Sequence, residues 1–206
     1  MAPTPSLVIH ADPKSLLALT PILREGVIAA VRPGVPLRRT LVEDLGLDPV
    51  YVEERVQTVF LDGSPVDDID ADCASAGCTL ALAGALPGVA GIAMRRKSPV
   101  GVFREGITHG PDLVEGTGQA GVGEGLTVTL KLFNSVAVEC LAQVLTRGVE
   151  VRSGRLAELL ADDPDALDEA SFTLDGSPAP RAALLNALAV GQGPLRVRAI
   201  LTGNAR

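Results

Sequence analysis

The pentapeptide Leu-Asp-Gly-Ser-Pro occurs twice in this chain of 206 residues, at positions 61–65 and 174–178. The two copies lie 113 residues apart, about the length of one small domain. The flanking residues also align, because at an offset of 114 Ile22 falls on Val136 and Gly34 falls on Gly148. This self-similarity indicates an internal duplication. The alternative is that common patterning produced two similar helix-to-strand units.

Apolar spacing predicts the same succession of elements in both copies. The alternating or continuous apolar runs predict strands at 7–10, 56–61, 79–83, 126–133, 171–174 and 195–201. Helical spacing and capping residues predict helices at 15–31, 40–47, 134–145 and 155–161. The Asp-Gly of each pentapeptide accepts positive φ at both central positions, which favours a tight hairpin turn. The sequence therefore predicts an α+β protein of two lobes, each roughly β-α-β-α-β-β.

The expected lobes occupy residues 1–109 and 126–206. The stretch between them, 110–125, is rich in glycine and has the composition of a flexible linker. It contains a loose G-x-G-x-x-G match, but no convincing strand precedes that match, as a dinucleotide site would require. We therefore interpret it as a linker.

Composition limits the classes of partner. Apolar residues make up 47% of the chain, which predicts a folded protein. The formal net charge is −7, and aromatic residues make up only 2%. Nucleic-acid binding needs a positive footprint, and stacking on bases needs aromatic side chains. The sequence therefore predicts no nucleic-acid partner.

An uncharged stretch at 74–94 precedes Arg95, Arg96 and Lys97, as a membrane span would precede cytoplasmic cations. It contains Pro87 and four glycines, whose free-energy cost within a helix exceeds the free energy that its five strongly apolar side chains would contribute to membrane insertion. We therefore expect no membrane span. The odd number of cysteines and the lack of a signal pattern predict a cytoplasmic protein.

Few residue patterns point to chemistry. Cys73 and Cys78 have the C-x4-C spacing that begins a plant-type iron–sulfur loop, but the remaining ligands are missing. We interpret them as structural and leave a redox role for Cys73 and Cys78 open. The acidic runs near Asp70 and Asp165 do not match a calcium loop and are expected to be solvated. The sequence predicts no catalytic residue, no metal site and no cofactor. It favours a non-enzyme over an enzyme but does not decide between them.

Residues 40–91 resemble the ubiquitin-like (β-grasp) sulfur carriers of molybdopterin and thiamine biosynthesis. The matching segments are RRTLVEDLGL, VQTVFLDGSPVDDID and SAGCTLALAGALPGVAG. The resemblance implies a β-grasp fold. In those carriers the tail ends in a free diglycine that is adenylated and sulfurated, whereas here Gly91 is followed by Ile92 and the chain continues to Arg206.

The leading hypothesis is a non-catalytic binding or scaffolding protein with a protein partner. Its expected contact surface is a sheet face or the loop containing Pro87, Gly88 and Gly91, with Arg95 and Arg96 at its rim. One alternative is a sulfur-carrier-derived protein of cofactor biosynthesis. Another is a thiol or redox protein, or an enzyme, that uses Cys73, Cys78 or His109. A homo-oligomer is also left open.

Overall fold

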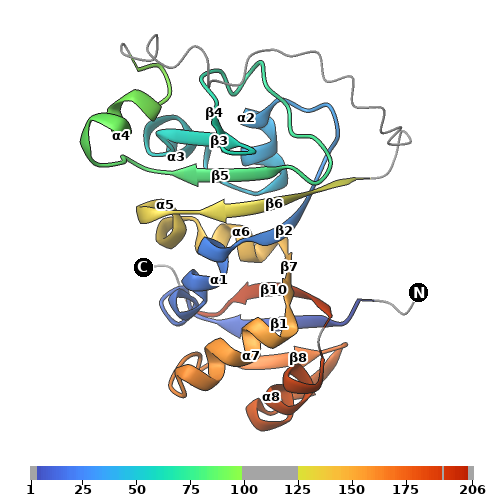
Figure 1. The fold of residues 1–206 in the computed structure, drawn as a ribbon. Helices are drawn as coiled ribbons and strands as arrows, with labels where there is room; N and C mark the ends of the chain where they lie inside the picture. The colour runs from blue at the N-terminus through green and yellow to red at the C-terminus, as the bar shows by residue number, and fades with distance from the viewer. Residues whose placement is uncertain (1–3, 99–124, 192, 204–206) are drawn as a thin grey trace. The chain divides into compact units, whose positions relative to one another are not determined.

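The computed structural model describes residues 4–98, 125–191 and 193–203 (Figure 1). The chain divides into two compact units, which are described separately below. Unit 1 comprises Met1–Val27 and Val138–Arg206, and unit 2 comprises Ile28–Ala137. Apart from Gly125, the expected glycine-rich linker at 110–125 lies outside the described residues, as does His109.

Unit 2 is built on the strand order β4-β3-β5-β6-β2. Its strands are β2 (Val27–Val31), β3 (Thr58–Leu61), β4 (Ser64–Pro65), β5 (Thr79–Ala83) and β6 (Leu126–Leu132). Its helices are α2 (Leu37–Arg39), the π-helical turn η2 (Thr40–Asp44), α3 (Pro49–Glu54), α4 (Gly88–Met94) and α5 (Asn134–Glu139). Strand β5 is antiparallel to β3 and parallel to β6. Alternate residues of β5 and β6, such as Leu80, Leu82, Leu130 and Leu132, are fully buried and form the core.

Unit 1 is built on the strand order β7-β10-β1-β8-β9. Its strands are β1 (Ser6–Ala11), β7 (Val149–Arg152), β8 (Ser171–Leu174), β9 (Ser177–Ala179) and β10 (Pro194–Leu201). Its helices are the 3-10 helix η1 (Ser15–Leu19), α1 (Thr20–Glu25), α6 (Leu141–Arg147), α7 (Ser153–Asp162) and α8 (Arg181–Val190). Strand β1 is the central strand, parallel to β10 and antiparallel to β8. Its inward residues Leu7, Ile9 and Ala11 are at most 1% exposed.

The expectation of two β-grasp-like lobes is wrong. The ten strands belong to one mixed sheet of an α+β protein. The first strand of each expected lobe pairs with strands expected in the other lobe. Strand β1 lies between β10 and β8, and β6 lies beside β5. Alternation along a strand predicts which face is buried but does not specify the neighbouring strand, so the sequence pattern did not reveal this exchange.

The helix expected at 15–31 also ends earlier than predicted. The chain leaves α1 at Gly26, whose φ is +121°. Residues Val27–Val31 then form strand β2, whose side chains alternate between buried and exposed. The short apolar run suits a helix face and a strand equally well, which explains the error.

The two Leu-Asp-Gly-Ser-Pro segments form the same hairpin. The φ angles are +48° and +84° at Asp62 and Gly63, and +49° and +81° at Asp175 and Gly176, as a tight hairpin turn requires. The Asp62 carboxylate accepts a hydrogen bond of 2.7 Å from the backbone N–H of Thr79, which starts β5. The Asp175 carboxylate accepts one of 2.7 Å from the backbone N–H of Ser6, which starts β1. Each repeat therefore fixes the start of the neighbouring strand.

The prolines of the repeat lie on the two terminal strands of the sheet order, β4 and β9. In each hairpin the pair next to the turn, Leu61–Ser64 or Leu174–Ser177, is followed by a pair that contains Pro65 or Pro178. In a two-residue hairpin this second pair is not hydrogen-bonded, so its backbone groups face away from the partner strand. Pro65 and Pro178 therefore remove an N–H that would face outward from the sheet edge.

Candidate functional site

Helix α4 presents apolar side chains to solvent. Val89 is 82% exposed and Ile92 is 49% exposed. The two residues are three positions apart and so lie on one side of the helix. Pro87 at the start of the helix and Arg95 at its end are also exposed. We call Pro87, Val89, Ile92 and Arg95 the α4 face.

The opposite side of α4 is fixed by close backbone contact. Gly91 is buried, and a Cβ atom at this position would lie only 2.1 Å from the carbonyl oxygen of Leu86. Real Cβ atoms do not approach other atoms this closely, so the position accepts only glycine without a backbone shift. The α4 face is therefore held in one orientation relative to the preceding loop.

A buried arginine fixes the segment that follows α4. The backbone N–H of Arg96 donates to the carbonyl of Gln57 at 2.8 Å. Its Nε donates to the carbonyl of Val56 at 3.0 Å, and its Nη2 donates to the carbonyl of Val52 at 2.9 Å. These three hydrogen bonds attach the end of the α4 segment to α3 and to the connection between α3 and β3. Arginine is rarely buried unless its donors are paired in this way.

The burial of Arg96 is only partly compensated. Burial lowers the pKa of its guanidinium, while the nearby Glu53 carboxylate acts in the opposite direction. Its Nη1 atom is buried without a hydrogen-bond partner, and so is the Oε1 atom of Gln57. A buried unpaired donor costs about 1–3 kcal/mol. The attachment is therefore specific in geometry but of moderate strength.

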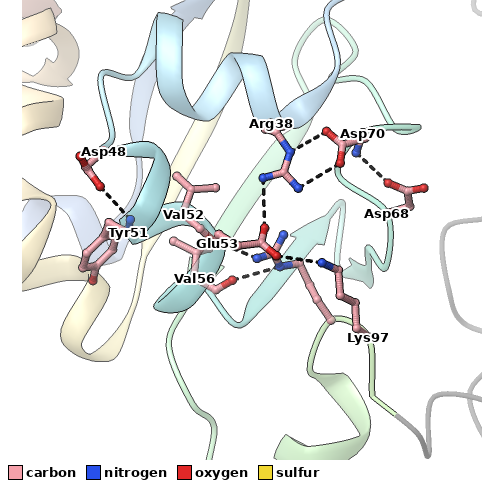
Figure 2. A network of polar contacts seen from close by, with 10 residues as sticks. Arg38, Asp48, Tyr51, Val52, Glu53, Val56, Asp68, Asp70 and Lys97 are labelled. Carbon is pink, nitrogen blue, oxygen red and sulfur yellow. Dashed lines mark hydrogen bonds and ion pairs between the residues drawn. The ribbon is translucent and has the colours of Figure 1, made fainter.

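A charged network surrounds this attachment (Figure 2). Lys97 Nζ lies 2.8 Å from Glu53, Glu53 lies 3.0 Å from Arg38, and Arg38 makes a two-pronged contact with Asp70 at 2.6 and 2.9 Å. Hydrogen bonds from Lys97 and Arg38 lower the pKa of Glu53 to about 2. The hydrogen bonds that Arg38 donates to the carboxylates of Asp70 and Glu53 raise the pKa of Arg38 above its usual value. The network links α2, α3 and the connection after β4 to the end of the α4 segment.

Local sequence explains how α3 enters this network. The Asp48 carboxylate accepts a hydrogen bond of 2.9 Å from the backbone N–H of Tyr51, and Pro49 occupies the first turn. Both features favour a helix start. Lys97, by contrast, adopts a φ of +55°, a left-handed conformation that is unfavourable for a lysine. Such strain persists only where surrounding contacts impose it, and here its ion pair with Glu53 is one of them.

The structure divides the expected binding residues into two groups. Pro87, Gly88 and Arg95 are exposed, whereas Gly91 and Arg96 are buried and act as supports. The segment that resembles a sulfur-carrier tail thus contains helix α4 rather than an extended tail. Sequence reasoning missed Val89 and Ile92, although their spacing after Pro87 and Gly88 was a signal for a short helix with an apolar side.

None of the three cysteines forms a disulfide. Cys73 is exposed, whereas Cys78 and Cys140 are buried. Burial is the main cause that raises the pKa of the Cys78 thiol. A raised pKa disfavours the reactive thiolate, so Cys78 is poorly suited to nucleophilic or redox chemistry.

The acidic run after β4 has a structural role. Asp70 is paired with Arg38, and the Asp68 carboxylate accepts a hydrogen bond of 2.8 Å from the backbone N–H of Asp70. Across the described residues, no group of three or more His, Cys, Asp or Glu side chains could hold a metal ion. Within the same residues, no helix combines the length and apolar character that crossing a bilayer requires.

The described residues of unit 1 line at least two open hollows. The larger has a volume of about 510 Å³ and lies between η1, α6 and the end of β10. The smaller, about 320 Å³, lies beside β9 and includes Arg181. The guanidinium of Arg181 donates to the backbone carbonyls of Ala166 and Leu160, so its donors serve the fold rather than a ligand.

No family model, curated protein or solved structure matches this chain.

Proposed function

We propose that this protein is a non-catalytic binding protein that engages a protein partner through the α4 face. The observation that carries the proposal is the exposure of Val89 and Ile92, at 82% and 49%, on a helix held in place from behind. A helix in a water-exposed position normally turns such residues toward a core. Apolar side chains exposed together mark interaction sites more often than single ones do.

The anchoring of α4 supports the same function. Gly91 packs against the Leu86 backbone, and Arg96 attaches the following residues to α3 and to the connection before β3. A helix held in this way loses little conformational freedom on binding, so more of the contact energy appears as affinity. The mode that fits is a short helix inserted into an apolar groove of the partner, with anchors at i and i+3.

Charge defines the partner further. Residues 73–98 contain three cationic side chains and no carboxylate, in a chain with a formal net charge of −7. Of these three, Arg96 is buried and Lys97 is paired with Glu53, so the cations of this stretch are largely engaged within the chain. The overall negative charge disfavours nucleic acid as the partner. We also place the protein in the cytoplasm, because three cysteines without a disulfide suit a reducing compartment.

Photo-cross-linking in cells of the protein's own species tests this function. A photoreactive amino acid would replace Val89, and in a control chain it would replace Val190, which lies on α8 and is 85% exposed. We expect a discrete protein adduct from position 89 that is lost when Ile92→Asp is added. The absence of an adduct from position 89, or the same adducts from both positions, would contradict the proposal.

A further inference from the structure

We propose that the solvent-facing side of the unit 1 sheet binds an extended acidic segment of a partner protein, whose carboxylates pair with Arg196 and Arg198 of β10. This surface is distinct from the α4 face, and the inference goes beyond the proposed function. It is built on the neighbouring strands β10 and β1 (Figure 1). We call it the β10 face and define it by six residues that pair across the two strands: Ser6, Val8, His10, Arg196, Arg198 and Ile200.

The β10 face is open to solvent. Its six residues are half-buried or exposed, and Ile200 is 42% exposed. The residues that alternate with them along the strands, such as Leu7, Ile9 and Val197, are at most 2% exposed. Since successive side chains of a strand point to opposite sides of the sheet, the helices of unit 1 pack on the other side. The β10 face is therefore accessible to a partner.

The β10 face carries two arginines and no carboxylate. Glu150 of the adjacent strand β7 lies opposite Arg196, and its Oε1 is 3.3 Å from Arg196 Nη2. This ion pair is exposed and therefore weak. Arg198 donates through Nε to the carbonyl of Thr146 at 3.1 Å, and within the described residues its two Nη groups have no hydrogen-bond partner. Donors of both arginines are therefore available to a ligand.

The net charge of −7 does not cancel this local positive charge. Six of the carboxylates of unit 1 lie within residues 158–169, on α7 and the connection after it, which belong to the helical side of the sheet. At an ionic strength of about 0.15 M the Debye length is about 8 Å, so exposed charges farther away than this are largely screened. The contacts made directly by Arg196 and Arg198 therefore decide which ligand binds.

The spacing along β10 specifies the ligand. Arg196, Arg198 and Ile200 follow one another at every second residue, which in a strand corresponds to about 6.8 Å. An extended peptide has the same period, so an acidic, an acidic and an aliphatic residue at alternate positions would match this row. Guanidinium groups form two-pronged contacts with carboxylates. With two cations and no aromatic side chain, the β10 face offers little to the phosphates and bases of nucleic acid.

Amide chemical-shift mapping of the full chain tests this inference with the capped peptide Glu-Thr-Glu-Thr-Leu. We expect shift changes in β1 and β10 and, because exposed ion pairs are weak, a dissociation constant between about 0.1 and 1 mM. The peptide Gln-Thr-Gln-Thr-Leu has nearly the same shape without the charges and should bind at least about fivefold more weakly. Equal binding of the two peptides, or shift changes confined to other elements, would overturn the inference.

Two variants and a matched control assign the binding to the arginines. Arg198→Glu should weaken binding of the acidic peptide at least about fivefold. Arg196→Gln should weaken it less, and it provides a second measurement if loss of the bond to Thr146 disturbs folding of Arg198→Glu. Arg24→Glu makes the same charge change at an exposed arginine of α1 and should bind like the unaltered chain. Equal losses in Arg24→Glu and Arg198→Glu would show that net charge, and not the β10 face, determines binding.

Two further measurements separate this inference from its alternatives. Val89→Asp, which disables the α4 face, should leave binding of the acidic peptide unchanged, so either proposal can fail without the other. A single-stranded oligothymidylate is the competing ligand. If it shifts the same amides and binds more tightly than the acidic peptide, the partner is nucleic acid and the inference is wrong.

Discussion

Arg96 illustrates how one side chain positions a whole surface. It is 8% exposed, and its donors reach the carbonyls of Val52 and Val56. Nothing in the sequence distinguishes it from its neighbour Arg95, because arginine is an exposed residue in most contexts. The sequence therefore could not show that Arg96 is buried while its neighbour Arg95 is exposed.

Replacing Arg96 should loosen this support. Arg96→Met keeps an apolar stem but removes the donors to the two carbonyls. We expect the free energy of unfolding to fall by about 1–3 kcal/mol, since buried acceptors lose their partners. Urea unfolding would measure the change. Arg95→Met is the control and should stay within about 0.5 kcal/mol of the unaltered chain, because its side chain is exposed.

Glu53 should make stability depend on pH in the acid range. The ion pairs with Lys97 and Arg38 lower its pKa from the usual 4.5 to about 2 in the folded protein. The unfolded chain therefore binds more protons between these values, so stability is complete above about pH 4.5 and falls as the pH drops toward 2. Glu43, with a pKa also near 2, acts in the same direction.

Urea unfolding between pH 7 and pH 2 would measure this dependence. Glu53→Gln should reduce the slope between pH 4.5 and 2, and 1 M salt should flatten it further because the pairs are exposed. A slope that is the same in Glu53→Gln as in the unaltered chain would show that these pairs do not contribute.

At the scale of elements, strand ends were predictable and strand partners were not. The strands at Thr79–Ala83 and Ser171–Leu174 have the predicted ends, because turn residues bound each apolar run. The position of β1 between β8 and β10 depends on pairing across most of the chain, for which a single sequence carries no signal. Helix α4 was missed because it is short and rich in glycine.

The two hairpin aspartates offer a matched pair of tests. Asp62→Ala should expose the amides of β5, and Asp175→Ala should expose those of β1, because each substitution removes the acceptor for the first N–H of that strand. Each should cost about 2 kcal/mol, from the lost hydrogen bond and the left-handed backbone that alanine disfavours. Hydrogen exchange would locate the effect.

Asparagine serves as the control at both positions. It keeps a side-chain oxygen and tolerates the left-handed conformation, so Asp62→Asn and Asp175→Asn should retain most of the protection. If Asp175→Ala leaves the amide hydrogen exchange of Ser6–Ala11 unchanged, the hydrogen bond from Ser6 to Asp175 is not required to hold β1 in place.

For the whole molecule, the repeated proline governs what the sheet edges can do. Strands β4 and β9 end the sheet order, and Pro65 and Pro178 lack the N–H that would face outward there. Exposed edges are templates for pairing with other chains, and proline is a common means of preventing it. Pro178 is exposed and can act in this way on β9, whereas Pro65 is buried, so the edge of β4 is already covered at that residue.

Removing this block should promote association through the edges. Pro178→Val restores an outward N–H on the exposed edge strand β9. In a Val89→Asp background, which removes the proposed α4 contact, we expect Pro178→Val to increase dimer or aggregate formation in light scattering. Pro178→Gly, which restores the N–H but disfavours strand structure, should have a smaller effect. Equal scattering from Pro178→Val and its parent would show that the proline is not protective.

The hydrogen bond between Ser6 and Asp175 also has a consequence for biosynthesis. These two residues are 169 positions apart, so β1 leaves the ribosome long before the strands on either side of it exist. Unit 2 can form its β3, β5 and β6 pairings while the rest of the chain is still being made. Unit 1 is completed only after translation of β10, and until then the apolar residues Leu7, Ile9 and Ala11 need protection by a chaperone or by provisional contacts.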